Sequence, residues 1–544
     1  MSVVTAGRDK LMNLVSESIY DNPVVVREMR TRMRDWKAFT TMGGYLLLVG
    51  GILFIVYMAM LDEHSYYSAG YFEVYIANKN IGQKLFIWLT WTQVVLLSLA
   101  IPALTFSSIT QELERKTMEL LALTRLSPGK IVLGKQLSGF LYSLVLMLCS
   151  LPLAGMCLMF GGISPAEIVV VYATLIAWAF LLTCLGVFWS SLFSRTASAA
   201  LFAYGTMGIY FLFTMPFGSM VIAHSHRTGN IHAFEALNPG WAAYDPMSNA
   251  VVCGLSIPTA LIAISLHVLM GVLFLLLTST HVRYYKVERA LPIRLLVIAI
   301  TLGLIWLLMG NPGVLFHLPT TTADAKDLIG IACSILLAFL CLAASAFATG
   351  PLKKHPQQPV PIYALSIRRT FTSDLGGAIA FMALWTIILL GGLLGTYWWL
   401  AKVEHVRVAS EVWKAGLQMS LSILAIVVGV SAIGILGSCI VRLRRNAAAI
   451  VLLFVILIWG GYGIVLAYYV DGITDTSGPI WQLAAFWPMT PVLTLTGEWL
   501  RMPKLWWNVK DSWLVTSIAY LDLTALVLIA ASRPAAKTGG VREE

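Results

Sequence analysis

Residues 168–189 read IVVVYATLIAWAFLLTCLGVFW and contain no charged side chain. A helix that crosses a bilayer needs roughly 20 consecutive apolar residues, so this stretch is long enough to span a membrane. Similar runs recur on both sides of it, because 58% of the 544 residues are hydrophobic and only 12% are charged. That charged share is about half of the ~25% found in soluble domains. We therefore predict an all-α, polytopic transmembrane helical bundle.

Apolar runs bounded by charge, Gly or Pro predict about 12 spans along the chain. They lie near residues 39–61, 85–108, 130–161, 166–193, 197–223, 258–282, 295–317, 327–349, 375–400, 413–441, 447–470 and 511–532. This composition excludes a soluble enzyme, a nucleic-acid-binding protein and a secreted disulfide scaffold. The seven cysteines form no CxxC motif, and most of them lie inside apolar runs, where a thiol behaves as a small hydrophobic group.

Basic residues are unevenly distributed between the two sides of this map. With the N-terminus inside, 27 of the 37 Lys and Arg residues lie on the cytoplasmic side and 10 on the other. Because basic segments are retained in the cytoplasm, we predict a multi-pass protein of the plasma or bacterial inner membrane. Both termini are expected to be cytoplasmic.

The chain divides into an N-terminal arm, two halves and a tail. We expect an elbow arm at 1–37, a six-span unit at 38–282 containing the loop 109–129, a second six-span unit at 283–532, and a tail at 533–544. Arg195 and Arg445 are offset by 250 residues, and Pro239 and Pro488 by 249, which favours a duplication of six plus six spans. A competing register pairs residues 23–30 with 361–368 and makes the second copy four spans long.

The arm and the first long polar loop both carry helix patterns. In the arm, apolar residues are interleaved with the basic residues Arg27, Arg30, Arg32, Arg34 and Lys37, which is typical of a helix lying on membrane lipid. In the loop, Ser108 and Gln111 fit a capping box. Two i,i+4 pairs support a helix over residues 112–126: Glu112 with Lys116, and Arg115 with Glu119. A helix with both charge signs and apolar residues such as Leu113 and Met118 suits docking in a protein groove.

The same loop carries a family resemblance. Residues 112–128 read ELERKTMELLALTRLSP, residues 130–135 read KIVLGK, and residues 22–34 read NPVVVREMRTRMR. The first two resemble the segment E-x-x-x-x-T-x-E-L-L-L-x-T-P-L-S … I-V-x-G-K of exporter-type, second-class ABC transporter permeases. The third resembles the N-P-V-x-x-R-E-L-R elbow before their first span. The resemblance covers the first ~220 residues.

The resemblance implies a permease subunit that exports a substrate with a separate ABC ATPase subunit. It makes the loop a coupling helix whose partner-binding residues are Glu112, Arg115, Lys116, Glu119 and Arg125. The sequence departs from the family where Arg125 replaces a usual Pro, and where the corresponding loop of the second half, 350–374, lacks the E-L-L motif. A homodimer or heterodimer of permeases stays open as the assembled form.

We expect no catalytic residue and no cofactor in this chain. No complete Walker A sequence is present: Gly129, Gly134 and Lys135 have its spacing, but Gln136 stands where the motif requires Ser or Thr. ATP is therefore expected to be bound by the partner. The candidate metal ligands are weak: they are His224, His226 and His232, which form an H-x-H pattern followed by a third His.

Few ionisable groups lie within the predicted spans. Those that we single out are Asp522, His267 and, at a helix end, Glu167. Secondary carriers usually carry more such groups, so a secondary carrier is the weaker alternative. The sequence contains no motif of a polytopic membrane enzyme, which disfavours that class. A non-transporting membrane scaffold remains an alternative. The residues do not identify the substrate.

Overall fold

The computed structural model of the protein is dominated by long helices. It describes residues 22–34, 36–61, 81–118, 120, 123, 128–208, 210, 211, 214, 237–241, 246–252, 255–281, 290–309, 375–403, 417, 421, 424–433, 518, 521 and 522. Within these residues the elements are α2 (Pro23–Arg34), α3 (Trp36–Leu61), α5 (Ile81–Thr105), α6 (Thr110–Glu114), α8 (Pro128–Met159), α9 (Pro165–Leu192), β1 (Asn249–Val252), β2 (Leu255–Pro258), α11 (Thr259–His281), α12 (Ala290–Met309) and α15 (Leu375–Val403).

Five stretches of the described chain are long and apolar enough to cross a membrane. They are Ala38–Met60, Ile81–Glu114, Gly129–Met159, Pro165–Leu192 and Thr259–Thr280. Each coincides with one of the predicted spans, which confirms a multi-pass helical membrane bundle. Residues 196–208 are also helical, at the start of the predicted span 197–223. The predicted spans 327–349 and 447–470 lie outside the described residues, so the total of about 12 stays a prediction.

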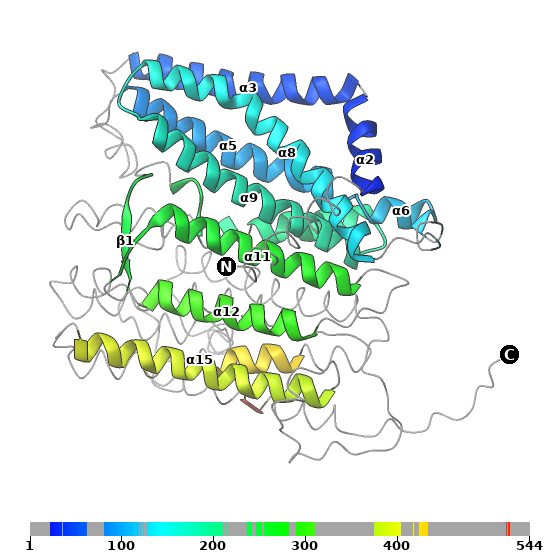
Figure 1. Ribbon diagram of the computed structural model, residues 1–544, viewed down its shortest axis with the longest axis vertical. Helices are drawn as coiled ribbons and strands as arrows, with labels where there is room; N and C mark the ends of the chain where they lie inside the picture. The colour runs from blue at the N-terminus through cyan, green and yellow to red at the C-terminus, as the bar shows by residue number, and fades with distance from the viewer. Residues whose placement is uncertain are drawn as a thin grey trace, which may run out of the picture. The chain divides into compact units, whose positions relative to one another are not determined.

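Helix α9 forms the centre of the first bundle (Figure 1). It packs against α5, α8 and α11, and most of its side chains from Val171 to Leu192 are buried. Its first turn is held by a capping box, in which Ser164 Oγ accepts from the Glu167 N–H and Glu167 accepts from the Ser164 N–H. Glu167, which the sequence marked only as an ionisable group at a helix end, therefore caps α9.

The C-terminal end of α5 fits tightly against α9. Thr105, the last residue of α5, donates its hydroxyl to the Ile101 carbonyl at 2.9 Å. A Cβ added at Gly186 would overlap this Thr105 hydroxyl, and one added at Gly139 of α8 would lie 2.7 Å from the Thr105 methyl group. The two glycines therefore let three helices converge at the point where the chain enters α6.

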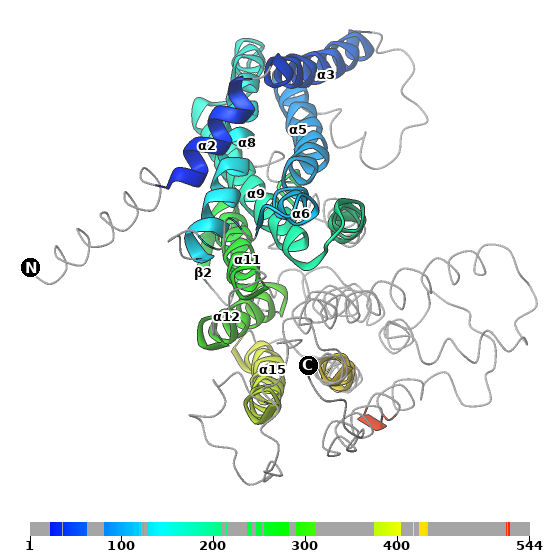
Figure 2. The same ribbon diagram turned by 90° about the vertical axis from the view of Figure 1, so that its right-hand side faces the viewer.

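Helices α2 and α3 lie at the edge of this bundle. Only 17% of the most apolar stretch of α3 is buried inside the protein, whereas 72% of the corresponding stretch of the α5 span is buried. Its Thr41 hydroxyl is hydrogen-bonded to the Tyr142 hydroxyl of α8. Helix α2 does not continue the line of α3 but crosses its end (Figures 1 and 2), and it packs on α8.

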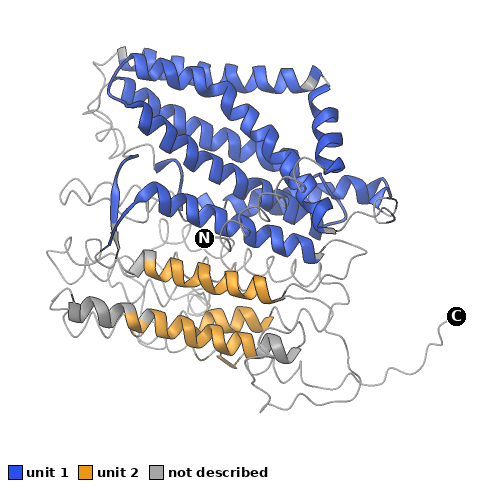
Figure 3. Ribbon diagram, in the orientation of Figure 1, with its two compact units in different colours: residues 1–288 blue, residues 289–544 orange. Residues whose placement is uncertain are grey.

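The chain separates into two compact units, residues 1–288 and residues 289–544 (Figure 3). In the first, an antiparallel hairpin of β1 and β2 precedes α11, with Ala250 opposite Ile257. In the second, α12 packs on α15, where Trp385 donates its indole N–H to Thr301 Oγ1 at 2.9 Å. The predicted duplication of six plus six spans and the competing register both stay predictions, because much of the second unit lies outside the described residues.

Candidate functional site

The predicted coupling helix is shorter than the sequence suggested. After α5 the backbone makes a turn over residues 106–109, and α6 then runs only from Thr110 to Glu114. Lys116 has a φ of 58°, a left-handed conformation that costs a non-glycine residue about 1 kcal/mol and ends the helix. The continuous helix over residues 112–126 and its Glu112–Lys116 pair were therefore wrong.

The N-terminus of α6 is capped by another helix. The predicted capping box is absent, because α6 begins after Ile109, which offers no side-chain acceptor. Instead, Ser190 Oγ of α9 accepts from the backbone N–H groups of Ile109 and Thr110, at 2.8 and 3.0 Å. Helix termini need such acceptors for their free N–H groups. The start of α6 is thus fixed to α9.

Replacing Ser190 with Ala should loosen this end of α6. Ile109 and Thr110 are 2% and 0% exposed, so their N–H groups would lose their acceptor inside the protein, at a cost of about 2 kcal/mol. Hydrogen exchange of these two amides should accelerate about thirtyfold. Ser191→Ala is the matched control, because Ser191 Oγ donates to the Phe188 carbonyl of its own helix at 2.7 Å. Equal exchange in both variants would contradict the capping role.

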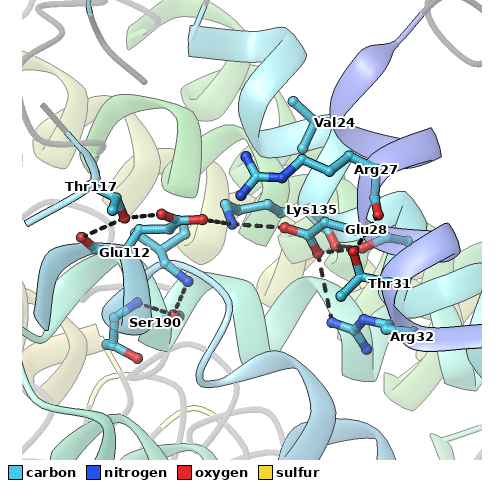
Figure 4. A network of polar contacts seen from close by, with 12 residues as sticks. Val24, Arg27, Glu28, Thr31, Arg32, Glu112, Thr117, Lys135 and Ser190 are labelled. Atoms are coloured by element: carbon cyan, nitrogen blue, oxygen red, sulfur yellow. Dashed lines mark hydrogen bonds and ion pairs between the residues drawn. The ribbon is translucent and has the colours of Figure 1, made fainter. Parts of the chain in front are cut away.

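Lys135 of α8 lies between two carboxylates (Figure 4). Its side chain is 3% exposed, and its Nζ lies 2.8 Å from Glu28 Oε1 of α2 and 3.4 Å from Glu112 Oε1 of α6. An isolated buried ammonium costs several kcal/mol, which paired carboxylates offset. We call Glu28, Lys135 and Glu112 the charge triad. It joins three elements at one end of the bundle.

The carboxylate of Glu28 is itself held in place. Ser138 Oγ of α8 donates to Glu28 Oε2 at 3.0 Å, and Arg32 Nη2 of the next turn of α2 lies 3.8 Å from the same oxygen. Arg32 also donates to the Leu104 carbonyl of α5 at 3.2 Å. These contacts orient Glu28 toward Lys135 and connect α2 to both α5 and α8.

The backbones of α2 and α8 approach closely beside the triad. Asn22 caps α2, since its Oδ1 accepts from the Val24 N–H at 3.1 Å, while its Nδ2 donates to the Lys130 carbonyl at 2.8 Å. A Cβ added at Gly134 would lie 2.7 Å from Val24 Cβ. The structure therefore brings together the two motifs that carried the family resemblance, N-P-V-x-x-R-E and I-V-x-G-K.

The C-terminus of α6 contacts a further helix. Glu114 Oε1 accepts from the Thr196 N–H at 2.8 Å and from Thr196 Oγ1 at 2.9 Å. Thr196 begins the helical segment 196–208, and a carboxylate at a helix N-terminus is favoured by the helix dipole. Beneath α6, Leu113 and Met118 pack on Val132 of α8. The element is thus attached to α8, α9 and the segment 196–208.

The exposed side of this region carries both positive charge and apolar groups. Arg115 and Lys116 are exposed, and Leu120 and Leu123 are 66% and 83% exposed. Of the five predicted partner-binding residues, Arg115 and Lys116 thus face outward, while Glu112 turns inward to Lys135. Glu119 and Arg125 lie outside the described residues.

The remaining candidate residues of the sequence are three histidines, Asp522 and His267. His224, His226 and His232 lie outside the described residues, and within those residues no three His, Cys, Asp or Glu side chains gather as metal ligands would. Asp522 is helical and exposed. His267 is buried, with its ring 5.2 Å from that of Trp178.

The segment 237–241 packs into the bundle at a distance from α6 along α5. The Leu237 carbonyl lies 3.3 Å from His267 Nε2 and also accepts from the Tyr210 hydroxyl. Trp241 meets Trp91 of α5 edge to face, with ring centroids 5.0 Å apart.

The fold and this site define a multi-pass helical membrane protein in which the short helix α6 is bonded to α8, α9 and the segment 196–208. Residues 92–280 match the family model described as ABC-2 family transporter protein, which confirms the resemblance to ABC-2 permeases. No curated protein and no solved structure matches the chain. The match runs from within α5 to the end of α11 and includes α6, Lys135 and Ser190. Residues 92–280 are therefore similar to the membrane-permease part of ABC transporters.

Proposed function

We propose that the chain is the membrane subunit of an ATP-driven exporter whose ATPase is a separate polypeptide. The partner contacts α6 and the turn after it, on the cytoplasmic side, and binds and hydrolyses ATP itself. The observation that carries this proposal is the attachment of α6 to three parts of the bundle, through Ser190, Lys135 and Thr196. Permeases of this family typically work with a separate ATPase subunit, which supports the same conclusion.

The contacts of α6 suggest how force reaches the spans. A push on α6 acts on α9 through Ser190, on α8 through Lys135, and on residues 196–208 through Glu114. Because packed helices move as rigid bodies more readily than they deform, these helices shift together when the partner closes. Their shift changes access to the substrate path, and the direction of transport follows the exporter class that the sequence resembles.

Reversing the two exposed charges of the turn should abolish partner binding. Arg115→Glu combined with Lys116→Glu replaces two positive charges with negative ones, which would face a partner surface complementary to positive charge. A like-charge contact in an interface costs several kcal/mol. We expect recovery of ATPase activity with the purified chain to fall at least about tenfold. Folding should be retained, because both side chains are exposed.

Lys84→Glu is the matched control for this test. Lys84 lies near the other end of the same span, Ile81–Glu114, so its reversal should leave ATPase recovery unchanged. Equal recovery from the double variant and the control would remove α6 as the docking element. Normal ATPase recovery without any substrate flux in sealed vesicles would instead identify a non-transporting scaffold.

A further inference from the structure

Helix α2 presents a purely basic face outward. Arg27, Arg30 and Arg34 are spaced three and four residues apart, which places them on one side of a helix, and all three are exposed. The only acidic residue of α2, Glu28, turns toward Lys135 instead. No carboxylate of α2 therefore offsets the charge of this face.

An apolar strip lies next to the basic face. Val26, Met29 and Met33 follow the same helical spacing, and Val26 is 46% exposed. Just after α2, Trp36 and Phe39 are 69% and 70% exposed, where the span beginning at Ala38 enters the membrane. Exposed aromatic rings are typical of the headgroup level of a bilayer.

The orientation of α2 fits the surface of a bilayer. It crosses the end of α3 instead of extending it (Figures 1 and 2), so α2 runs along the membrane plane if α3 spans the membrane. We propose that the basic face of α2 binds anionic phospholipid headgroups. An acidic protein surface would match the charge equally well, but the apolar strip and the exposed rings beside it, next to the start of a membrane span, favour a lipid surface.

Lipid bound at α2 also acts on α6. Glu28 lies on α2, and it meets Lys135 at 2.8 Å, which in turn meets Glu112 of α6 at 3.4 Å. A headgroup that holds α2 in place therefore holds the charge triad, and with it the element proposed to receive the ATPase. Lipid binding itself goes beyond the proposed transport function and requires no ATPase.

The binding step is tested with the full-length chain in mixed micelles of equal phosphatidylglycerol and phosphatidylcholine, with retained lipids counted by native mass spectrometry. Arg30→Gln with Arg34→Gln should lower the preference for phosphatidylglycerol about tenfold or more, since each arginine contributes about fivefold near an anionic surface. Arg27 stays unchanged because its charge also acts on Glu112. Arg30→Lys with Arg34→Lys should retain the preference.

A charge-matched control separates a site from net charge. Arg115→Gln with Lys116→Gln removes two exposed positive charges away from α2 and should leave the lipid preference intact. An equal loss of preference in this control would overturn the proposal. So would unchanged lipid preference in the α2 variant with lost ATPase recovery, which would make the basic face a protein-docking surface.

The link to α6 is tested by hydrogen exchange in nanodiscs without any ATPase. Phosphatidylglycerol should slow exchange over residues 22–34 and 107–117 relative to phosphatidylcholine. In Glu112→Gln, which keeps Lys135 paired with Glu28 at 2.8 Å, the protection of 22–34 should persist and that of 107–117 should disappear. Protection of both segments in that variant would refute the link through the triad, and the absence of protection in the wild type would refute lipid binding at α2. Neither result bears on the ATPase partnership.

Discussion

Lys135→Met should produce one of the largest losses of stability of any single substitution in the first unit. The change leaves the carboxylates of Glu28 and Glu112, each about one-fifth exposed, facing each other without a cation. Removing one partner of a largely buried ion pair costs about 3 to 5 kcal/mol. We expect a markedly lower unfolding temperature in detergent and a loss of the folded fraction during size-exclusion chromatography.

A second set of changes separates the contribution of the Lys135 charge to stability from the contribution of its side-chain packing. Glu28→Gln and Glu112→Gln, added to Lys135→Met, remove the uncompensated charges and should restore most of the stability, because a neutral cluster avoids their desolvation. Wild-type stability for Lys135→Met alone would show that the triad contributes nothing. Failure of the triple variant to recover would show that packing by the lysine stem matters more than its charge.

Gly186→Val should disrupt the point where α5 meets α9. Even a single Cβ at this position overlaps the Thr105 hydroxyl, and Thr105 is fully buried. Overpacking of a close helix contact costs about 1 to 3 kcal/mol and forces backbone shifts. The expected result is a lower unfolding temperature, with faster exchange of the amides in residues 105–110.

The matched control is Gly155→Val in α8, where an added Cβ has no neighbour within 4 Å. This change should leave stability unchanged within about 0.5 kcal/mol or improve it slightly. Thr105→Gly combined with Gly186→Ala should recover part of the loss, because it removes the overlapping atoms. If Gly186→Val and Gly155→Val behave alike, the close approach of α5 and α9 does not limit stability.

The sequence was informative wherever the signal was local. Runs of apolar residues located the five described spans to within a few residues, because membrane insertion depends on the hydrophobicity of each segment by itself. The family motifs were also read as contiguous strings. The α6 helix was predicted too long because i,i+4 pairing assumed that Glu112 had only local partners, whereas its cation is Lys135, 23 residues away.

The charge triad escaped prediction for the same reason. Lys135 and Glu28 are 107 residues apart, and nothing in one sequence links them. One signal was present: Lys135 lies seven residues into the long apolar helix α8, where an unpaired charge is expensive. A search for its partner among nearby acidic residues of the arm and loop would have found both Glu28 and Glu112.

The order of these residues along the chain bears on how the protein is made. Glu28, Glu112 and Lys135 are all synthesised before α9, whereas Ser190 follows Lys135 by 55 residues. At roughly 5 to 20 residues per second, the ribosome needs about 3 to 11 s to cover that interval. During this interval Lys135 can already be neutralised as α8 leaves the translocon, while the first N–H groups of α6 still lack their acceptor. The order of these residues along the chain thus allows the ion pairs to form first and the capping of α6 by Ser190 to follow.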